Sequence, residues 1–163
     1  MNAAQLLAKI NEVIGAEFHG IPIYYDQLPK DFKRPSFALE LQKDSFEDLN
    51  IALVRKTVTV LVTGFVETNA YYDSSREELN HRQERVLELF SAPSMQVEDR
   101  YPTVTANKGK GAPDFFEVEV TFSWSDTRPG YHDPDDMTDP ESGAVPKMEQ
   151  IVCDISAGGG ETT

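Results

Sequence analysis

The sequence has little of what disulfide frameworks, membrane spans and signal peptides require. One cysteine, Cys153, stands among 163 residues. An internal disulfide framework is therefore excluded, and we expect synthesis in a reducing cytoplasm. No stretch approaches the roughly 20 consecutive apolar residues of a membrane span. The first residues lack the basic start and apolar core of a signal peptide. These absences predict a protein with no membrane association.

Basic residues are also scarce, at 15 Lys and Arg against 28 Asp and Glu, for a net charge of −13. Such a chain repels phosphate backbones and anionic lipid surfaces, which disfavours direct binding to duplex nucleic acid or to membranes. The segment from Arg128 to Thr163 holds eight acidic and two basic residues and contributes −6 of that charge. Its polarity predicts a flexible acidic extension, residues 127–163, after one folded domain, residues 1–126.

Catalytic and ligand-binding motifs are missing. The run Asn107–Gly111 has the glycines and lysines of a phosphate loop but neither its spacing nor a following helix. The acidic run His132–Asp139 lacks the glycine and glutamate of a calcium-binding loop. His19 and His81 have no partner at metal-ligand spacing, and no serine lies in a nucleophile motif. We therefore predict no metal, no cofactor and no enzymatic activity.

Hydrophobic periodicity predicts an α+β fold in which a twisted, mixed or antiparallel sheet is covered on one face by two main helices. The expected helices are Asn2–Ile14 and Ser74–Ser91, and the expected strands are Ile21–Tyr25, Ser36–Gln42, Val54–Val66, Val97–Ala106 and Phe115–Ser125. Asn2 is the expected N-cap of the first helix and Gly15 its end. The polar run Lys43–Asn50 is predicted to project as a loop. A second loop, Lys108–Pro113, is expected to join the last two strands.

The longest strand has two different faces. Valines at positions 54, 58, 60, 62 and 66 share one face, which we expect to be core. Arg55, Thr57, Thr59, Leu61 and Thr63 share the other, which is half polar and is predicted to meet a neighbouring subunit. Two tyrosine pairs, at positions 24 and 25 and at 71 and 72, flank strand ends. Paired tyrosines more often pack or line an interface than bind a cofactor.

The order of short patterns resembles one known family. The first helix is followed by Ile23-Tyr24-Tyr25-Asp26 and then by Arg34-Pro35-Ser36-Phe37-Ala38-Leu39. A long alternating strand, Thr57–Val62, comes next, then a helix beginning near Arg76–Leu79 and a final strand ending Phe116–Phe122. Over residues 1–126 this order is similar to that of phage tail terminator proteins. The acidic extension and the long connection between positions 43 and 52 depart from the family pattern.

The resemblance implies a structural virion protein, assembled in the host cytoplasm and located at the tail or neck. It implies a homo-oligomeric ring, expected to be a hexamer, that caps the tail tube and joins the head-side connector. The implied partners are further copies of the chain, the tail tube protein, the sheath protein in a contractile tail and a connector protein, with DNA only in transit. Candidate subunit or tube contacts are Thr57, Thr59, Leu61 and Thr63 on the long strand, and Phe46, Leu49, Lys108 and Lys110 in the two loops.

Two other functions stay open at this point. Another neck or head–tail completion protein would share the size and the ring. An acidic inhibitor that mimics DNA would share the net charge, but it would need a continuous acidic stripe. Here Arg55, Lys56, Arg76, Arg82 and Arg85 interrupt the acidic residues. A monomer or dimer that binds a nuclease tightly would favour the mimic, and a closed ring would favour either virion protein.

Overall fold

The computed structural model describes residues 1–136, 138 and 139. Internal contacts divide the chain between Arg128 and Pro129 into two units, and the first unit holds every helix and strand described below. Cys153 and most of the acidic extension lie outside the described residues, so the flexibility of that extension stays a prediction.

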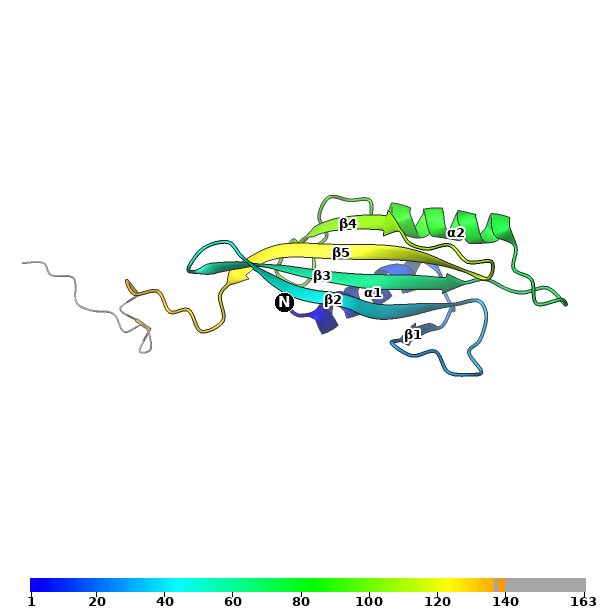
Figure 1. The fold of residues 1–163 in the computed structure, drawn as a ribbon, viewed down its shortest axis with the longest axis horizontal. Coiled ribbons are helices and arrows are strands. Elements are labelled where there is room, and N and C mark those ends of the chain that lie inside the picture. The colour runs from blue at the N-terminus through cyan, green and yellow to red at the C-terminus, as the bar shows by residue number, and fades with distance from the viewer. Residues whose placement is uncertain (137, 140–163) are drawn as a thin grey trace, which may run out of the picture. The chain divides into compact units, whose positions relative to one another are not determined.

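The first unit is an α+β domain with two helices and one five-stranded mixed sheet (Figure 1). Its elements are α1 (Ala3–Glu17), β1 (Ile23–Tyr25), β2 (Ser36–Asp48), β3 (Leu53–Phe65), α2 (Arg76–Leu89), β4 (Thr103–Lys108) and β5 (Phe115–Thr127). The strand order is β1-β2-β3-β5-β4, with β1 parallel to β2 and all other neighbours antiparallel. The predicted fold class is confirmed.

Helix α1 begins where a polar cap satisfies its first free amides. The Asn2 side chain accepts a hydrogen bond from the Gln5 backbone amide at 3.0 Å, and the Asn2 amide donates to Gln5 Oε1 at 2.7 Å. This confirms the predicted start. The predicted end is wrong, because the helix continues through Gly15 to Glu17 and buries Ile14 against the sheet. Packing of this last turn outweighs the helix-ending tendency of glycine.

Helix α2 is capped by Ser75, whose hydroxyl accepts from the Glu78 amide at 3.4 Å. The sequence allows either Ser74 or Ser75 as the N-cap, and the structure shows that Ser75 is the cap. Leu79, Val86 and Phe90 are buried together with the stripe of α1 in a single core. Both helices therefore pack on one face of the sheet, and α1 lies behind the strands in the view of Figure 1.

Strict alternation along β3 and β5 produces that core face. Val58, Val60 and Val62 are at most 1% exposed and lie opposite Phe122, Val120 and Val118 of β5. Residues between them point to the other face, as the period of two requires. The predicted division of the long strand into a core face and a half-polar face is confirmed.

Two predicted boundaries are wrong for the same reason. Strand β2 does not end at Gln42 but continues to Asp48, so the predicted loop Lys43–Asn50 is mostly strand. A register shift near Gln42 carries the pairing with β3 past this point. Strand β4 begins at Thr103 and not at Val97. Pairing with a long neighbouring strand decides where β2 ends and where β4 begins. These ends cannot be predicted from local hydrophobicity.

Candidate assembly surfaces

One face of the sheet carries no helix among the described residues, and we call it the open face. The four predicted contact residues of β3, at positions 57, 59, 61 and 63, are half-buried on this face. Thr59 lies opposite Thr121 of β5, and their hydroxyl oxygens are 3.0 Å apart, within hydrogen-bonding distance. The structure therefore brings these four residues together as one surface, centred on a threonine pair.

Charged side chains surround this threonine pair: Lys43 of β2 lies opposite Thr59, and carboxylates follow toward the end of β3. Leu61 pairs with Glu40 of β2 on one side and with Glu119 of β5 on the other. Both glutamates are exposed. Thr63 pairs with Glu117 in the same way. The open face is thus a mixture of hydroxyls and charged groups, which suits a wet, polar contact better than a dry apolar one.

The outer halves of β2 and β3 form an arm, residues 43–57, with a tip that contains Leu49 and Ile51. Phe46 is 57% exposed and Ile51 is 81% exposed. Phe46 lies on the face opposite Thr57, where the Lys56 ammonium is 5.0 Å from the centre of its ring. The predicted contact residues Phe46 and Leu49 therefore belong to a surface separate from the open face.

Arg128 holds the tip of the arm. Its guanidinium donates to the backbone oxygens of Asn50 and Ile51 and forms an ion pair of 2.8 Å with Asp48. Its backbone amide donates to the Ala52 oxygen at 2.8 Å. These contacts order a turn that exposes apolar side chains, so the arm is a preformed projection.

The lysines of the predicted phosphate-like run lie at the opposite end of the sheet. Lys108 ends β4, and its ammonium lies 3.9 Å from a carboxylate oxygen of Glu84 on α2. The Lys110 amide donates to the Glu117 carboxylate at 3.1 Å. Lys110 thus meets the border of the open face at Glu117, but neither lysine meets the arm, so the sequence-predicted residues do not form one site.

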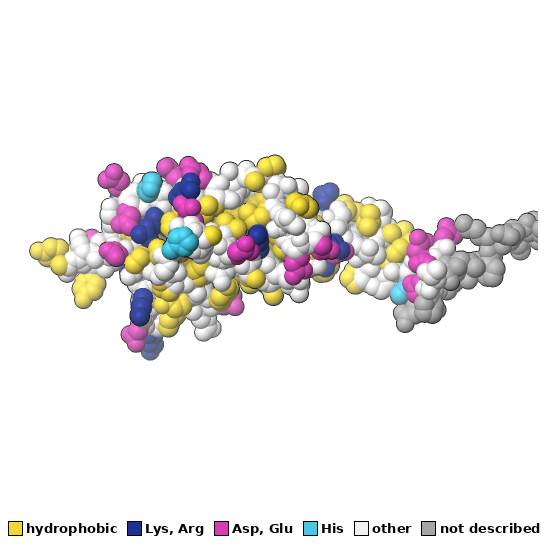
Figure 2. Space-filling model, turned by 180° about the vertical axis from the view of Figure 1, so that it is seen from behind, with side chains coloured by type: hydrophobic (Ala, Val, Ile, Leu, Met, Phe, Trp, Pro, Cys, Tyr) yellow, Lys and Arg dark blue, Asp and Glu magenta, His cyan; other side chains and the backbone are white. Residues whose placement is uncertain are grey.

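A further projection follows the end of β3, and we call residues 67–73 the tyrosine loop. Tyr71 and Tyr72 are 85% and 86% exposed. The Asn69 side chain accepts from the Tyr71 and Asp73 amides at 2.8 and 2.9 Å, and Tyr72 has a φ of 63°. A bulky residue rarely takes that backbone conformation. Apolar side chains project at this end of the domain in Figure 2.

Arg34 anchors both ends of the tyrosine loop. Its guanidinium donates to the Val66 oxygen before the loop and to the Ser74 hydroxyl after it, at 3.5 and 3.4 Å. It also forms an ion pair of 3.1 Å with Asp114 and lies over the Phe65 ring at 5.2 Å. A planar cation with several donors can hold these groups at once, where a lysine ammonium cannot match the geometry.

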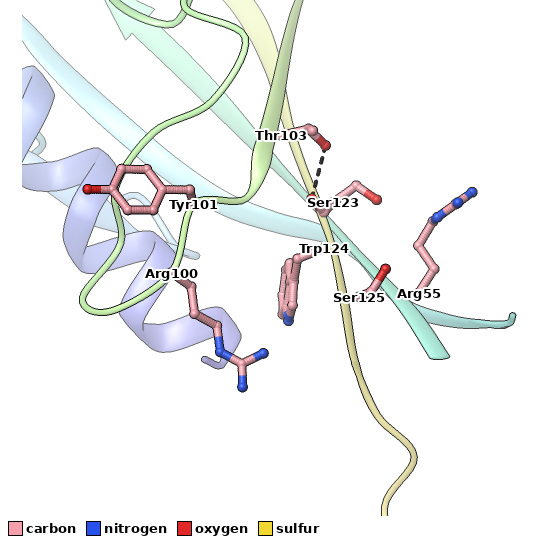
Figure 3. Close-up of a pocket in the computed structure, with 7 residues that line it drawn as sticks. All are labelled: Arg55, Arg100, Tyr101, Thr103, Ser123, Trp124 and Ser125. Carbon is pink, nitrogen blue, oxygen red and sulfur yellow. Dashed lines mark hydrogen bonds between the residues drawn. The ribbon is translucent and has the colours of Figure 1, made fainter. Parts of the chain in front are cut away.

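A groove lies along β5 where β4 has not yet begun (Figure 3). This edge groove is lined by Arg55, Arg100, Tyr101, Thr103, Ser123, Trp124 and Ser125. Arg100 and Trp124 lie on one side of β5, and Arg55 and Ser125 lie on the other. The groove therefore places two guanidinium groups and Trp124 around the end of β5, while the Tyr101 ring points away from the strand.

The cation on the Trp124 side of the groove has a carboxylate partner. Arg100 forms an ion pair of 3.1 Å with Asp126, which Lys56 also approaches at 3.8 Å. Burial alone would raise the pKa of the Asp126 carboxyl, but the hydrogen bond and the positive charge of Arg100 outweigh burial and lower this pKa. The groove therefore has a charged wall that stays ionised at neutral pH.

With these surfaces described, comparison with protein families matches residues 5–129 to the phage tail terminator proteins. The chain belongs to the phage tail terminator protein family. No curated protein sequence matches the chain. One solved structure matches over 78% of this chain and 96% of its own length, with 14% identity and a TM-score of 0.40, a likeness too low to carry an argument.

Membership of the tail terminator family identifies the chain as a structural phage tail protein, located in the virion and interacting with other tail components. Among residues 1–136, 138 and 139, no group of three or more His, Cys, Asp or Glu side chains is placed to hold a metal ion. No helix in that part of the chain has the length and apolarity to cross a bilayer.

Three features of this tail terminator protein could not be predicted, or were not predicted, from its sequence. The exposure of Ile51 and Leu53 could not be predicted, because both residues belong to a run of apolar residues that is typical of a buried strand. The short run Asn69–Tyr72 begins with an asparagine, a residue that often stabilises turns, and this was a signal for a structured loop. The edge groove had no sequence signal, because it depends on the relative lengths of β4 and β5.

Proposed function

We propose that this chain is a non-enzymatic ring subunit that caps the tail tube, ends its polymerisation and joins it to the head-side connector. The ring is a hexamer. Residues 1–126 form the assembly domain, and residues 127–163 form an acidic extension. The observation that carries this proposal is the open face, a wide sheet surface left without a helix in a protein of the tail terminator family.

Ring closure has requirements that this surface meets. A ring needs a head-to-tail interface made from two different patches of the same chain. The open face supplies one patch, with Thr57, Thr59, Leu61 and Thr63 half-buried and able to lose their remaining exposure to a neighbour. The net charge of −13 would keep DNA that passes through the lumen from binding to its wall, so transit would not be slowed.

The two ends of the sheet supply contacts to different layers. The arm exposes the apolar side chains of Phe46 and Leu49, which suits insertion against the tail tube. Lys108 and Lys110 lie at the other end, where they suit an acidic surface on the next component. Each end then contacts one partner, and the ring joins the two.

Native mass spectrometry of the purified chain, alone and mixed with its tail tube protein, tests this proposal. A hexamer in either sample supports it, and imaging should then place rings at tube ends. Thr59→Lys puts a second ammonium opposite Lys43 in the open face and should abolish the ring. The matched control Asn80→Lys adds the same charge at an exposed position of α2 and should leave the ring intact. A monomer in both samples would overturn the ring and direct tests to nuclease inhibition.

The charge distribution disfavours the DNA-mimic alternative. Acidic and basic side chains are mixed over the face shown in Figure 2. Arg85 pairs with both Glu17 and Glu88, and Arg82 pairs with Glu78. A DNA mimic needs carboxylates spaced like phosphates and free of such partners, so a virion protein accounts better for this surface.

A further inference from the structure

We propose that the tyrosine loop of one copy docks into the edge groove of a second copy, beside the open face, and that the ring interface cannot form without this contact. This inference rests on the proposed function and names the interface that closes it. The occupant of the groove is another copy of this chain.

The two features lie too far apart to meet within one copy. The tyrosine loop follows Phe65 at the end of β3, whereas Arg55 of the groove lies ten residues earlier on the same strand. At about 3.3 Å per residue, that strand separates them by roughly 33 Å. A projection at one end and a recess near the other can combine only between copies. Repeated head to tail, such a contact forms a ring or a filament.

The tyrosine loop and the edge groove also match in shape. The loop projects Tyr71 and Tyr72, and the groove offers a recess of about 740 Å³ around the end of β5, with Arg55 and Ser125 on one side of the strand and Trp124 on the other. Recesses of roughly 300–1,000 Å³ are typical of sites that hold ligands of drug size. Tyrosines carry large contact areas at small entropic cost, which makes them frequent anchors of interfaces.

The tyrosine loop and the edge groove are also complementary in charge. Glu67 and Asp73 border the tyrosines and are exposed, and the loop itself, residues 67–73, contains no basic residue. Arg55 and Arg100 line the groove. Each guanidinium already has one carboxylate partner. Arg55 lies 3.7 Å from the Glu47 carboxylate, and Arg100 lies 3.1 Å from that of Asp126. A guanidinium has five N–H donors, so each can bind a second carboxylate from the incoming loop.

The order of the loop supports the same assignment. Arg34 holds both ends, and the Asn69 side chain holds the turn while Tyr72 has a φ of 63°. Strained conformations that the surroundings enforce are found where a side chain must be presented in one direction. Because the loop is ordered before docking, it loses little entropy on binding.

The experiment uses two variants that each remove one half of the contact. Tyr71→Ser with Tyr72→Ser removes the projection, and Ser125→Trp fills the groove at an exposed position of β5. Under the conditions in which the wild type forms its ring, each variant alone should be monomeric in native mass spectrometry. A one-to-one mixture should give a single heterodimer and nothing larger, because only one intact projection and one intact groove can meet.

Controls and a second pair of variants keep the test decisive. Tyr25→Ser and Asn80→Trp make the same chemical changes at other exposed positions and should keep the ring. Asp73→Lys and Tyr101→Asp alter the loop and the groove without filling either, and each should weaken ring formation at least tenfold. They replace the first pair if circular dichroism shows that one of those variants is unfolded.

The outcomes separate this inference from the proposed function. Rings formed by every variant, or closed rings formed by the mixture, would overturn the loop-and-groove contact and leave the tail cap standing. A wild type that stays monomeric with and without tail tube protein would overturn the proposed function, and the contact with it. Monomeric variants that combine into one heterodimer would support both.

Discussion

Replacing Gly64 with alanine should destabilise the domain through one identifiable clash. Gly64 lies in β3 on the core face, directly opposite Phe116 of β5. A Cβ at this position would lie 2.1 Å from Cζ of the Phe116 ring and 2.3 Å from Cε1. Carbon atoms in contact are normally about 3.5–4.0 Å apart. The ring therefore occupies the space that a side chain at position 64 would need.

The Phe116 ring has little room to move. It is 2% exposed, and its edge packs on the Phe37 ring with centroids 6.2 Å apart. Overpacking of a filled core costs about 1–3 kcal/mol. Alanine recovers about 0.5–1 kcal/mol relative to glycine within a strand, because the unfolded chain is less flexible. The expected net loss is therefore about 1–2 kcal/mol in the free energy of unfolding.

Urea unfolding followed by the fluorescence of Trp124, the one tryptophan in the sequence, measures this loss. Gly111→Ala is the matched control, because nothing lies within 4 Å of a Cβ built there, and it should change stability by less than about 0.5 kcal/mol. Phe116→Leu combined with Gly64→Ala should cost less than the two single changes added together. A Gly64→Ala protein as stable as the wild type would refute the reasoning.

Three further predictions concern the anchors of the proposed surfaces. Arg34→Lys should lower the free energy of unfolding, measured by urea titration, by about 1–3 kcal/mol, because the planar set of donors is lost. Lys33→Ala, at the exposed neighbouring position, is the control and should have little effect. Tyr72→Asn should raise that free energy by about 1 kcal/mol, since asparagine accepts positive φ more readily, while native mass spectrometry should show a weaker ring. The lowered pKa of Asp126 means that its charged form stabilises the fold above its unfolded pKa and that this contribution is lost as pH falls through the folded value. Asp126→Asn should therefore flatten the decline of stability in acid, measured by unfolding at several pH values, and an unchanged slope would contradict the role of Arg100.

Local patterns were enough to predict the elements whose signal lies in their own residues. The alternation of β3 placed Val58, Val60 and Val62 in the core and left Thr59 on the other face, because side chains on a strand alternate whatever the neighbour is. The cap at Asn2 was equally local, since its hydrogen bonds join residues three positions apart. The α+β class followed from the order of such elements.

Only the tertiary structure decided the features that depend on distant partners. The polar run Lys43–Asp48 is a strand because β3 continues beside it, and no pattern within the run indicates this. The groove beside Trp124 exists because β4 begins opposite Ser123, whereas β5 continues to Thr127. Arg34 orders the tyrosine loop through groups 32 and 40 residues away. By itself the sequence determined which residues face inward along each element, because that depends on local period. The fold decided which polar and aromatic groups meet or project, because that depends on pairing across the chain.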